Sequence, residues 1–337
     1  MFQATGAIRK GMLASAVAAS ALFTIGPDAT PGTAAAVEVT PVTYKVLLSQ
    51  DATLPGTTYT VRGFHYGGSE PSSTVVLLLH GLSYGYWAWD FPTHLSEPGN
   101  PYTYQLARYL AVHGYDAVAA DELGYGTSDH PPFPDSRQLT IPAYANMAHQ
   151  LVSALHVGYP KVVIAGHSAG GEISNFEAGR YRDVEGLVDV DMCDVLASPE
   201  AITDIAINAS VGAVGDYGYF GGTVAERTRL MYDTADAEPS IVSRDNSMAY
   251  LTPTSEMQSI APQPARNVDP LVDAPVLVAF GANDAIFPST CQPFQAPLYL
   301  SSPQVTTFTL PSAGHSIMLH KNAGLFEAEL VSWLGSL

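Results

Sequence analysis

One short segment restricts the possible folds more than any other part of the chain. The apolar stretch Lys161 to Ala165 is typical of a buried strand, and it runs directly into Gly166-His167-Ser168-Ala169-Gly170 before a helical pattern begins. A sharp turn between strand and helix exposes the serine hydroxyl above the sheet, and the tight backbone favours glycine at the flanking positions. The placement of this motif after a strand makes Ser168 a candidate nucleophile.

Continuous apolar runs recur along the chain and predict strands covered on both faces, as in a mostly parallel sheet. These runs are Val75 to Leu79, Ala117 to Ala120, Val162 to Ala165, Leu187 to Val190 and Val276 to Phe280. The helical patterns between and after them are Tyr104 to His113, Ile141 to His156, Ala169 to Tyr181 and Ala323 to Leu334. Strands alternating with helices predict an α/β fold with helices on both faces of the sheet.

The segment from about residue 195 to 267 interrupts this alternation, and it is rich in Gly, Tyr, Ser, Thr and Pro. A structureless loop of such length is uncommon in a compact domain. We therefore predict a small, mostly helical lid inserted in the main fold. The alternative is a set of surface excursions that pack on one another.

The first residues have the pattern of an export signal. Arg9 and Lys10 precede an apolar run from about Gly11 to Ile25, and small residues suited to cleavage follow at Ala34 to Ala36. The apolar run is shorter than the ~20 residues that a membrane-spanning helix needs, which disfavours an uncleaved membrane anchor. We expect residues 1–36 to be a signal peptide, residues 37–337 to form the mature domain, and the protein to be secreted.

The net charge limits the partners that the protein is expected to bind. The formal net charge of −18 repels polyphosphates and anionic membranes, so neither a nucleic acid nor a membrane is expected as a partner. The composition and motifs of the sequence imply no protein partner.

The two cysteines, Cys193 and Cys291, favour one disulfide in an exported protein, whereas in a cytosolic protein they would be two buried thiols. Metal-ligand spacing, a dinucleotide-binding glycine fingerprint and a P-loop are all missing from the sequence, so we expect no metal and no cofactor.

Catalysis by a serine hydroxyl requires a base, because the hydroxyl is a weak nucleophile at neutral pH. His315 follows the strand-like stretch Val305 to Leu310 and precedes the last predicted helix. This position lies at the edge where strand ends present their loops. We predict that His315 is the base and that His167 and His320 have structural roles.

A carboxylate must hold the base in one tautomer without itself taking the proton. Asp284 comes shortly after the apolar strand Val276 to Phe280, and we predict that it is this acid. Asp194 and Asp191 are the alternatives, because they follow the preceding strand of the sheet.

Two backbone amides are candidates for stabilising an oxyanion. One belongs to Ala169, at the start of the helix behind Ser168. The other belongs to Leu82, in a turn that follows an apolar strand and in which Gly81 permits unusual backbone angles. The alternative is that this turn only connects two elements.

Aromatic residues follow that turn closely: Tyr84, Tyr86, Trp87, Trp89 and Phe91. We predict that Tyr86, Trp87 and Trp89 wall an acyl pocket. The alternative is that they fill the core.

With these residues in place, the sequence resembles the α/β-hydrolase superfamily, and within it the secreted lipase and esterase-like branch. The resemblance extends from about Thr74 to the C-terminus and includes the order serine, acid, histidine; the segment Asp121 to Asp129 is similar to the family's loop after its fourth strand. It implies a mostly parallel sheet of eight strands that is antiparallel only near its start. In that layout Cys193 and Cys291 lie on adjacent loops at the catalytic edge.

The predicted reaction is hydrolysis of a small-molecule carboxylic ester or lactone through a Ser-His-Asp triad and an acyl-enzyme. The same site suits cleavage of an amide or a carbon–carbon bond, since the fold alone does not select the chemistry. Serine at position 168 argues against the aspartate nucleophile of dehalogenases and epoxide hydrolases in this superfamily. A binding protein without turnover is a further alternative, although its signature would be a missing triad member.

Overall fold

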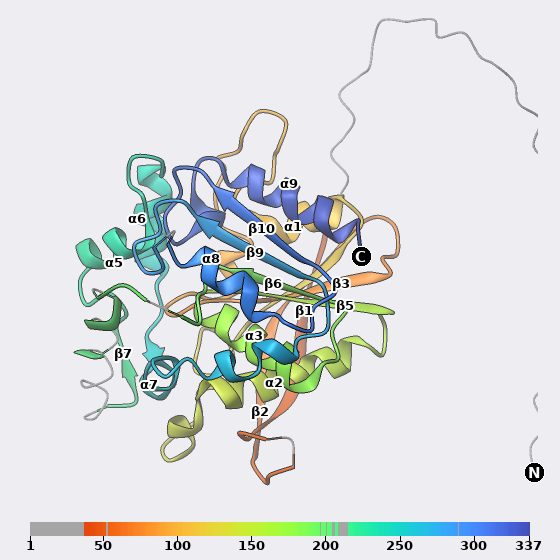
Figure 1. Ribbon diagram of the computed structural model, residues 1–337, viewed down its shortest axis with the longest axis vertical. Helices are drawn as coiled ribbons and strands as arrows, with labels where there is room; N and C mark the ends of the chain where they lie inside the picture. The colour runs from red at the N-terminus through yellow and green to blue at the C-terminus, as the bar shows by residue number, and fades with distance from the viewer. Residues whose placement is uncertain are drawn as a thin grey trace, which may run out of the picture. The chain divides into compact units, whose positions relative to one another are not determined.

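The computed structural model describes residues 37–51, 53–195, 197–199, 201–203, 206–207, 215–288 and 290–337. The predicted signal peptide, residues 1–36, lies outside the described residues. Eight strands form one sheet in the order β1-β2-β4-β3-β5-β6-β9-β10 (Figure 1). They are β1 (Glu38–Leu48), β2 (Thr57–Gly67), β3 (Thr74–Leu79), β4 (Asp116–Asp121), β5 (Lys161–His167), β6 (Gly186–Val190), β9 (Val276–Gly281) and β10 (Val305–Leu310).

The direction of the strands agrees with the resemblance. β1 pairs with β2 and β2 with β4 in antiparallel fashion, and all remaining neighbours are parallel. Every residue of β3, β4, β6 and β9 is buried, as their apolar runs predict for strands covered on both faces. The predicted α/β-hydrolase fold is therefore confirmed.

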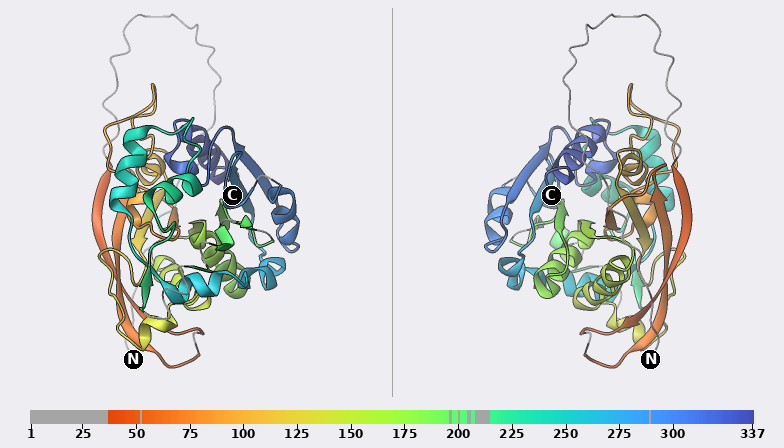
Figure 2. Two further views of the ribbon diagram at one scale, coloured as in Figure 1. Left: turned by 90° about the vertical axis from the view of Figure 1, so that its left-hand side faces the viewer. Right: turned by 90° about the vertical axis from the view of Figure 1, so that its right-hand side faces the viewer.

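Helices cover both faces of the sheet (Figures 1 and 2). α1 (Leu106–Val112) and α9 (Ala323–Leu334) contact each other on one face, and α2 (Ile141–Leu155) and α3 (Ala169–Tyr181) contact each other on the other. Short elements lie in the connections: α8 (Gln292–Gln295) and the 3-10 helices Tyr86–Ala88, Asp135–Gln138, Ala296–Leu298 and Ile317–Leu319. No helix in the described ranges is both long and apolar enough to cross a membrane.

The described part of the segment between β6 and β9 is mostly helical. It contains α5 (Val224–Met231), α6 (Pro239–Met248), α7 (Thr254–Ile260), the two-stranded sheet of β7 (Tyr217–Gly218) and β8 (Thr252–Pro253), and the 3-10 helices Pro264–Asn267 and Asp269–Leu271. α5, α6, α7 and β7 lie on the left of Figure 1, whereas the two 3-10 helices contact α3. The function of this insertion as a lid stays a prediction.

Cys193 and Cys291 form a disulfide, with their Cα atoms 6.3 Å apart. Cys193 follows β6, and Cys291 immediately precedes α8. The bond thus joins the loops after two adjacent strands, as the resemblance implies.

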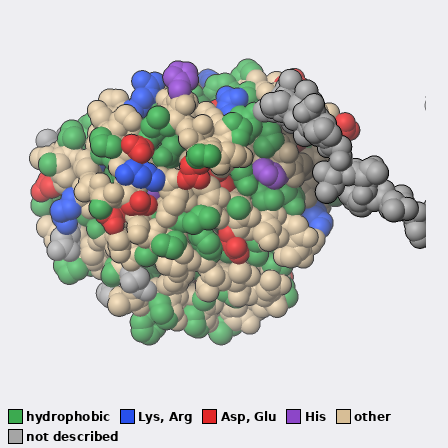
Figure 3. All heavy atoms as spheres, turned by 90° about the horizontal axis from the view of Figure 1, so that it is seen from above, with side chains coloured by type: hydrophobic (Ala, Val, Ile, Leu, Met, Phe, Trp, Pro, Cys, Tyr) green, Lys and Arg blue, Asp and Glu red, His purple; other side chains and the backbone are tan. Residues whose placement is uncertain are grey.

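On the face shown in Figure 3, the described lysine and arginine side chains are scattered among acidic and uncharged ones. They form no continuous basic surface on that face, which is in keeping with the net charge of −18.

Candidate active site

Ser168 stands on a strained turn between β5 and α3. Its backbone angles, φ 56° and ψ −119°, place a non-glycine residue at positive φ, a conformation that costs free energy and is concentrated at functional sites. The Ser168 amide donates to the carbonyl oxygen of Val190 on β6 (2.8 Å). A Cβ at Gly166 would collide with the carbonyl oxygen of Gly170, so the turn needs glycine where the motif has it.

His315 and Asp284 form a hydrogen-bonded pair that is fully buried. His315 Nδ1 lies 2.9 Å from Asp284 Oδ2, and both side chains have an exposed fraction of 0%. Asp284 Oδ1 accepts hydrogen bonds from the amides of Ile286 (2.7 Å) and Phe287 (3.0 Å), which fix the carboxylate. Since a carboxylate only accepts, Nδ1 carries the proton and Nε2 is the basic nitrogen. Nε2 has no hydrogen-bond partner among the described residues.

The two other candidate acids bind elsewhere. Asp191 accepts hydrogen bonds from the amides of Gly281 (2.7 Å) and Ile317 (3.4 Å). Burial, and after it the charge of Asp284, raises the pKa of Asp191 well above its usual range, which favours its neutral form. Asp194 Oδ2 accepts from Asn175 (2.9 Å) and Gln295 (3.1 Å). The structure thus pairs His315 with Asp284.

His167 and His320 hold the backbone around His315. Burial, followed by the neighbouring His315, lowers the pKa of His167 well below its usual range, so the ring is neutral; its Nε2 donates to the carbonyl oxygen of His315 (2.8 Å). His320 Nε2 accepts from the amide of Gly314 (2.9 Å), and its Nδ1 donates to the carbonyl oxygen of Ser316 (2.9 Å). In these hydrogen bonds both histidines contact backbone atoms.

The amides of Leu82 and Ala169 lie next to the nucleophile. Leu82 is in the turn after β3, which is so close to Ser168 that a Cβ at Gly81 would be 3.0 Å from the Ser168 Cβ. Ala169 begins α3, where the helix has unsatisfied amides. Neither amide donates a hydrogen bond to any described residue, so both can bind an oxygen of a ligand.

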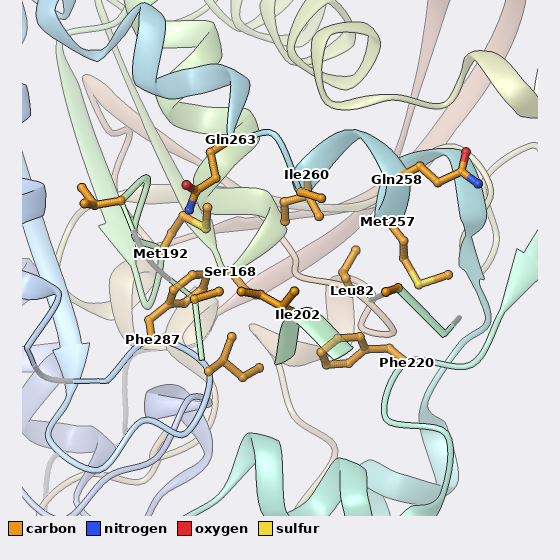
Figure 4. Close-up of a pocket in the computed structure, with 15 residues that line it drawn as sticks. Leu82, Ser168, Met192, Ile202, Phe220, Met257, Gln258, Ile260, Gln263 and Phe287 are labelled. Carbon is orange, nitrogen blue, oxygen red and sulfur yellow. The ribbon is translucent and has the colours of Figure 1, made fainter. Parts of the chain in front are cut away.

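A cavity of about 420 Å³ adjoins Ser168. Figure 4 shows that its side chains come from distant segments and are mainly apolar. The described lining comprises Leu82, Ser168, Met192, Val195, Ala197, Ile202, Ala206, Phe220, Met257, Gln258, Ile260, Ala261, Gln263, Ile286 and Phe287. A cavity lined in this way suits an uncharged, apolar group.

The predicted aromatic wall of the pocket is corrected by the structure. Tyr86, Trp87 and Trp89 are not among the residues that line the cavity. Trp87 and Trp89 are core residues, with exposed fractions of 2% and 0%, and Trp89 packs edge-on against His167. Tyr86 packs on Phe64, with ring centroids 4.7 Å apart. Trp87 and Trp89 therefore fill the core, as the alternative has it, and Tyr86 packs against the core while partly exposed.

A buried ion pair in the insertion reaches the loops of the site. Arg227 of α5 forms two hydrogen bonds with Asp245 of α6, and its Nε donates to the hydroxyl of Ser83, the residue after Leu82 (3.2 Å). Tyr84 stacks on the Arg227 guanidinium and hydrogen-bonds the hydroxyl of Ser316, the residue after His315 (2.7 Å). No sequence pattern predicts this contact, because an arginine and an aspartate in a polar segment usually lie on the surface of a protein.

The comparisons with known proteins agree with the fold. A model of the alpha/beta hydrolase family matches residues 76–328. A thermophilic esterase from Thermogutta terrifontis has a similar structure, with a TM-score of 0.66 and 22% identity over 87% of this chain and 98% of that one. The enol-lactonase from Burkholderia xenovorans has a TM-score of 0.63 and 17% identity over 82% and 97%.

Among curated proteins, Epoxide hydrolase 3 of Xenopus tropicalis is 30% identical over 122 residues. That match covers 36% of this chain and spans only 28% of the length of the relative. The family model, unlike this shorter match, extends over most of the described sheet and both sides of the insertion. The chain belongs to the alpha/beta hydrolase family.

Proposed function

We propose that this protein is a secreted serine hydrolase that cleaves carboxylic esters or lactones. The observation that carries the proposal is the buried pair of His315 Nδ1 and Asp284 Oδ2, 2.9 Å apart, on the same sheet edge as a serine in a strained turn beside an apolar cavity. The pair orients the imidazole so that Nε2, which forms no hydrogen bond with any described residue, is the proton acceptor.

In the proposed reaction, Ser168 Oγ attacks the carbonyl carbon while His315 Nε2 takes the hydroxyl proton. Asp284 stabilises the imidazolium and keeps its own charge. The amides of Leu82 and Ala169 stabilise the oxyanion, assisted by the positive end of the α3 dipole. His315 then gives the proton to the leaving alcohol, an ester forms between the acyl group and Ser168, and water hydrolyses it by the same steps.

The cavity supports an apolar, uncharged acyl group. Met192, Phe220, Met257 and Phe287 contribute flexible or aromatic surface without charge. The net charge of −18 acts against polyanionic substrates as well. The names of the similar structures, an esterase and an enol-lactonase, support an ester or lactone as substrate class.

Epoxide hydrolysis and other chemistries of the fold are the competing assignments. Serine rather than aspartate at position 168, in the turn between β5 and α3, argues against the epoxide reaction, although Epoxide hydrolase 3 is a relative. Amide and carbon–carbon bond cleavage use the same groups, and only substrates separate them.

A fluorophosphonate probe and a substrate panel test the proposal. We expect the probe to label the wild-type protein at Ser168 and to fail with S168A and H315A. We expect turnover of nitrophenyl esters and a lactone in a panel that also contains an anilide and an epoxide. Labelling that is equal in H315A, or turnover of the epoxide alone, would refute the assignment.

Export is tested separately by producing the whole chain in a host with a secretory pathway. The N-terminus of the exported protein is then sequenced, and we expect it to begin near Val37.

A further inference from the structure

Three side chains with metal-binding groups converge on the helical layer formed by α2 and α3. His149 belongs to α2, Glu177 to α3, and Asp183 to the turn between α3 and β6. One ligand atom of each lies within 4.8 Å of the other two. These residues do not line the cavity beside Ser168. The sequence predicts no metal cluster because His149 and Glu177 are 28 positions apart, and only the packing of α2 against α3 brings them together.

The Glu177 carboxyl is buried without a donor. Its exposed fraction is 0%, and neither carboxylate oxygen accepts a hydrogen bond from any residue other than Asp183 in the described ranges. The titratable groups beside it are His149, whose Nδ1 is 3.8 Å from Oε1, and Asp183, whose carboxyl is in hydrogen-bonding contact with it. Burial, and after it the charge of Asp183, raises the pKa of Glu177 well above its usual range. A buried carboxyl group that faces a second carboxyl group is stabilised either by a proton that the two share or by a cation.

The imidazole is oriented in advance. The His149 ring stacks on Tyr181 with centroids 3.9 Å apart and an angle of 6° between the planes. Nδ1 lies 2.8 Å from Asp183 Oδ2 and faces both carboxyl groups. The side chains of His149 and Asp183 are 25% and 27% exposed, so an ion has access from solvent.

We propose that His149, Glu177 and Asp183 bind a divalent transition-metal ion, with Zn²⁺ as the preferred ion. Zinc bonds of about 2.0–2.2 Å in tetrahedral geometry put ligand atoms about 3.3 Å apart. The observed separations of 2.8 Å and 3.8 Å bracket that value, so small side-chain shifts suffice. One imidazole and two carboxylates form a donor set that zinc accepts, with water in the fourth position, whereas calcium needs six or more oxygen ligands.

The ion would link α2, α3 and the turn that leads into β6. Because Ser168 immediately precedes α3, the ion would hold the end of that helix opposite the nucleophile. Its expected effect is on stability, and the proposal is independent of the reaction at Ser168.

The test uses the whole mature chain without a polyhistidine tag, stripped of metal with a chelator and dialysed. ZnCl₂ is titrated by calorimetry at neutral pH, and CaCl₂ is titrated in parallel. We expect one Zn²⁺ per chain, weaker binding of Ca²⁺, and a rise in Tm of about 4 °C when Zn²⁺ exceeds its Kd a hundredfold.

H149Q and E177Q are the informative variants, and H94Q, which removes an exposed histidine, is the matched control. We expect both cluster variants to bind Zn²⁺ at least about tenfold more weakly and to lose the Tm rise, while H94Q behaves as wild type. E177Q is nearly isosteric and neutral, so its own melting curve establishes that it is folded. Zn²⁺ binding that is unchanged in H149Q, or no binding by the wild type, would mean that Glu177 and Asp183 only share a proton.

Discussion

Arg227 Nη1 lies 2.6 Å from Asp245 Oδ2, and Nη2 lies 3.0 Å from Oδ1, in a pair whose side chains are 2% and 0% exposed. Removal of one partner leaves the other charge buried without compensation. We expect D245N to lower the free energy of unfolding by about 3–5 kcal/mol, measured by urea denaturation. D273N removes the partner of Arg182 in an exposed pair and should cost less than about 1 kcal/mol.

The same ion pair gives a kinetic prediction, because Arg227 holds Ser83 beside Leu82. R227K keeps the positive charge but cannot form the bidentate pair of hydrogen bonds with the Asp245 carboxylate. We expect kcat on a nitrophenyl ester to fall several-fold in R227K while KM changes little, since the Leu82 amide is proposed to stabilise the oxyanion of the transition state. An increase in KM with unchanged kcat would place Arg227 in substrate binding instead.

The choice of acid is tested by two conservative variants. In D284N the amide no longer fixes the tautomer of His315, and we expect kcat to fall about 10³- to 10⁴-fold without loss of the fold. In D194N the changed group binds Asn175 and Gln295, so we expect altered stability and nearly unchanged kcat. Steady-state kinetics on one ester, with circular dichroism as the check of folding, separates the outcomes. Loss of activity only in D194N would reverse the assignment.

Buried carboxyl groups predict a loss of stability as the pH rises. Burial raises the pKa of Glu327 and of Glu256 to about 8 in the folded protein, whereas both titrate near 4.5 in an unfolded chain. Between these values the folded state binds more protons, so the free energy of unfolding decreases with pH, by up to about 1.4 kcal/mol per pH unit for each group.

Urea denaturation from pH 5 to pH 8 measures this slope. We expect E327Q to flatten it, because glutamine has no proton to lose. D135N is the control: hydrogen bonds from Tyr59 lower the pKa of Asp135, so that carboxyl is charged in both states throughout this range. A slope that is the same in E327Q and wild type would contradict the prediction.

The cavity predicts how acyl-chain preference changes. Ile260 and Phe220 both line it, from α7 and from the loop before α5. I260W fills the cavity and should lower kcat/KM for an octanoate ester about tenfold relative to an acetate ester, whereas F220A should shift the preference the other way. The ratio of the two kcat/KM values is the measurement, and equal effects on both esters would show that the acyl group binds elsewhere.

The fold and the position of His315 beside Asp284 were predictable because each follows from a local pattern. Ser168, Asp284 and His315 each come just after an apolar run, and parallel strands bring such positions to one edge. The sheet of eight strands came from the resemblance rather than from the strand patterns. The number and order of the strands depend on pairings between distant segments.

The pocket was not predictable from local pattern. Trp87 and Trp89 are of the residue type that often lines a pocket, but an aromatic segment has the same sequence pattern whether it faces a cavity or the core. The true lining combines Met192 with Phe287, 95 positions later in the chain, and only tertiary packing brings them together. Glu177 is similar, because its neighbours come from another helix and a turn.

The disulfide makes the part of the chain between Cys193 and Cys291, which carries the insertion, a covalently closed loop with a sequence separation of 98. A protease that cuts one peptide bond within this loop leaves two fragments held together by sulfur. The strand that leads to Ser168 and the strand that leads to His315 then stay in one molecule. A nicked chain would run as a single band on a non-reducing gel and as two bands after reduction.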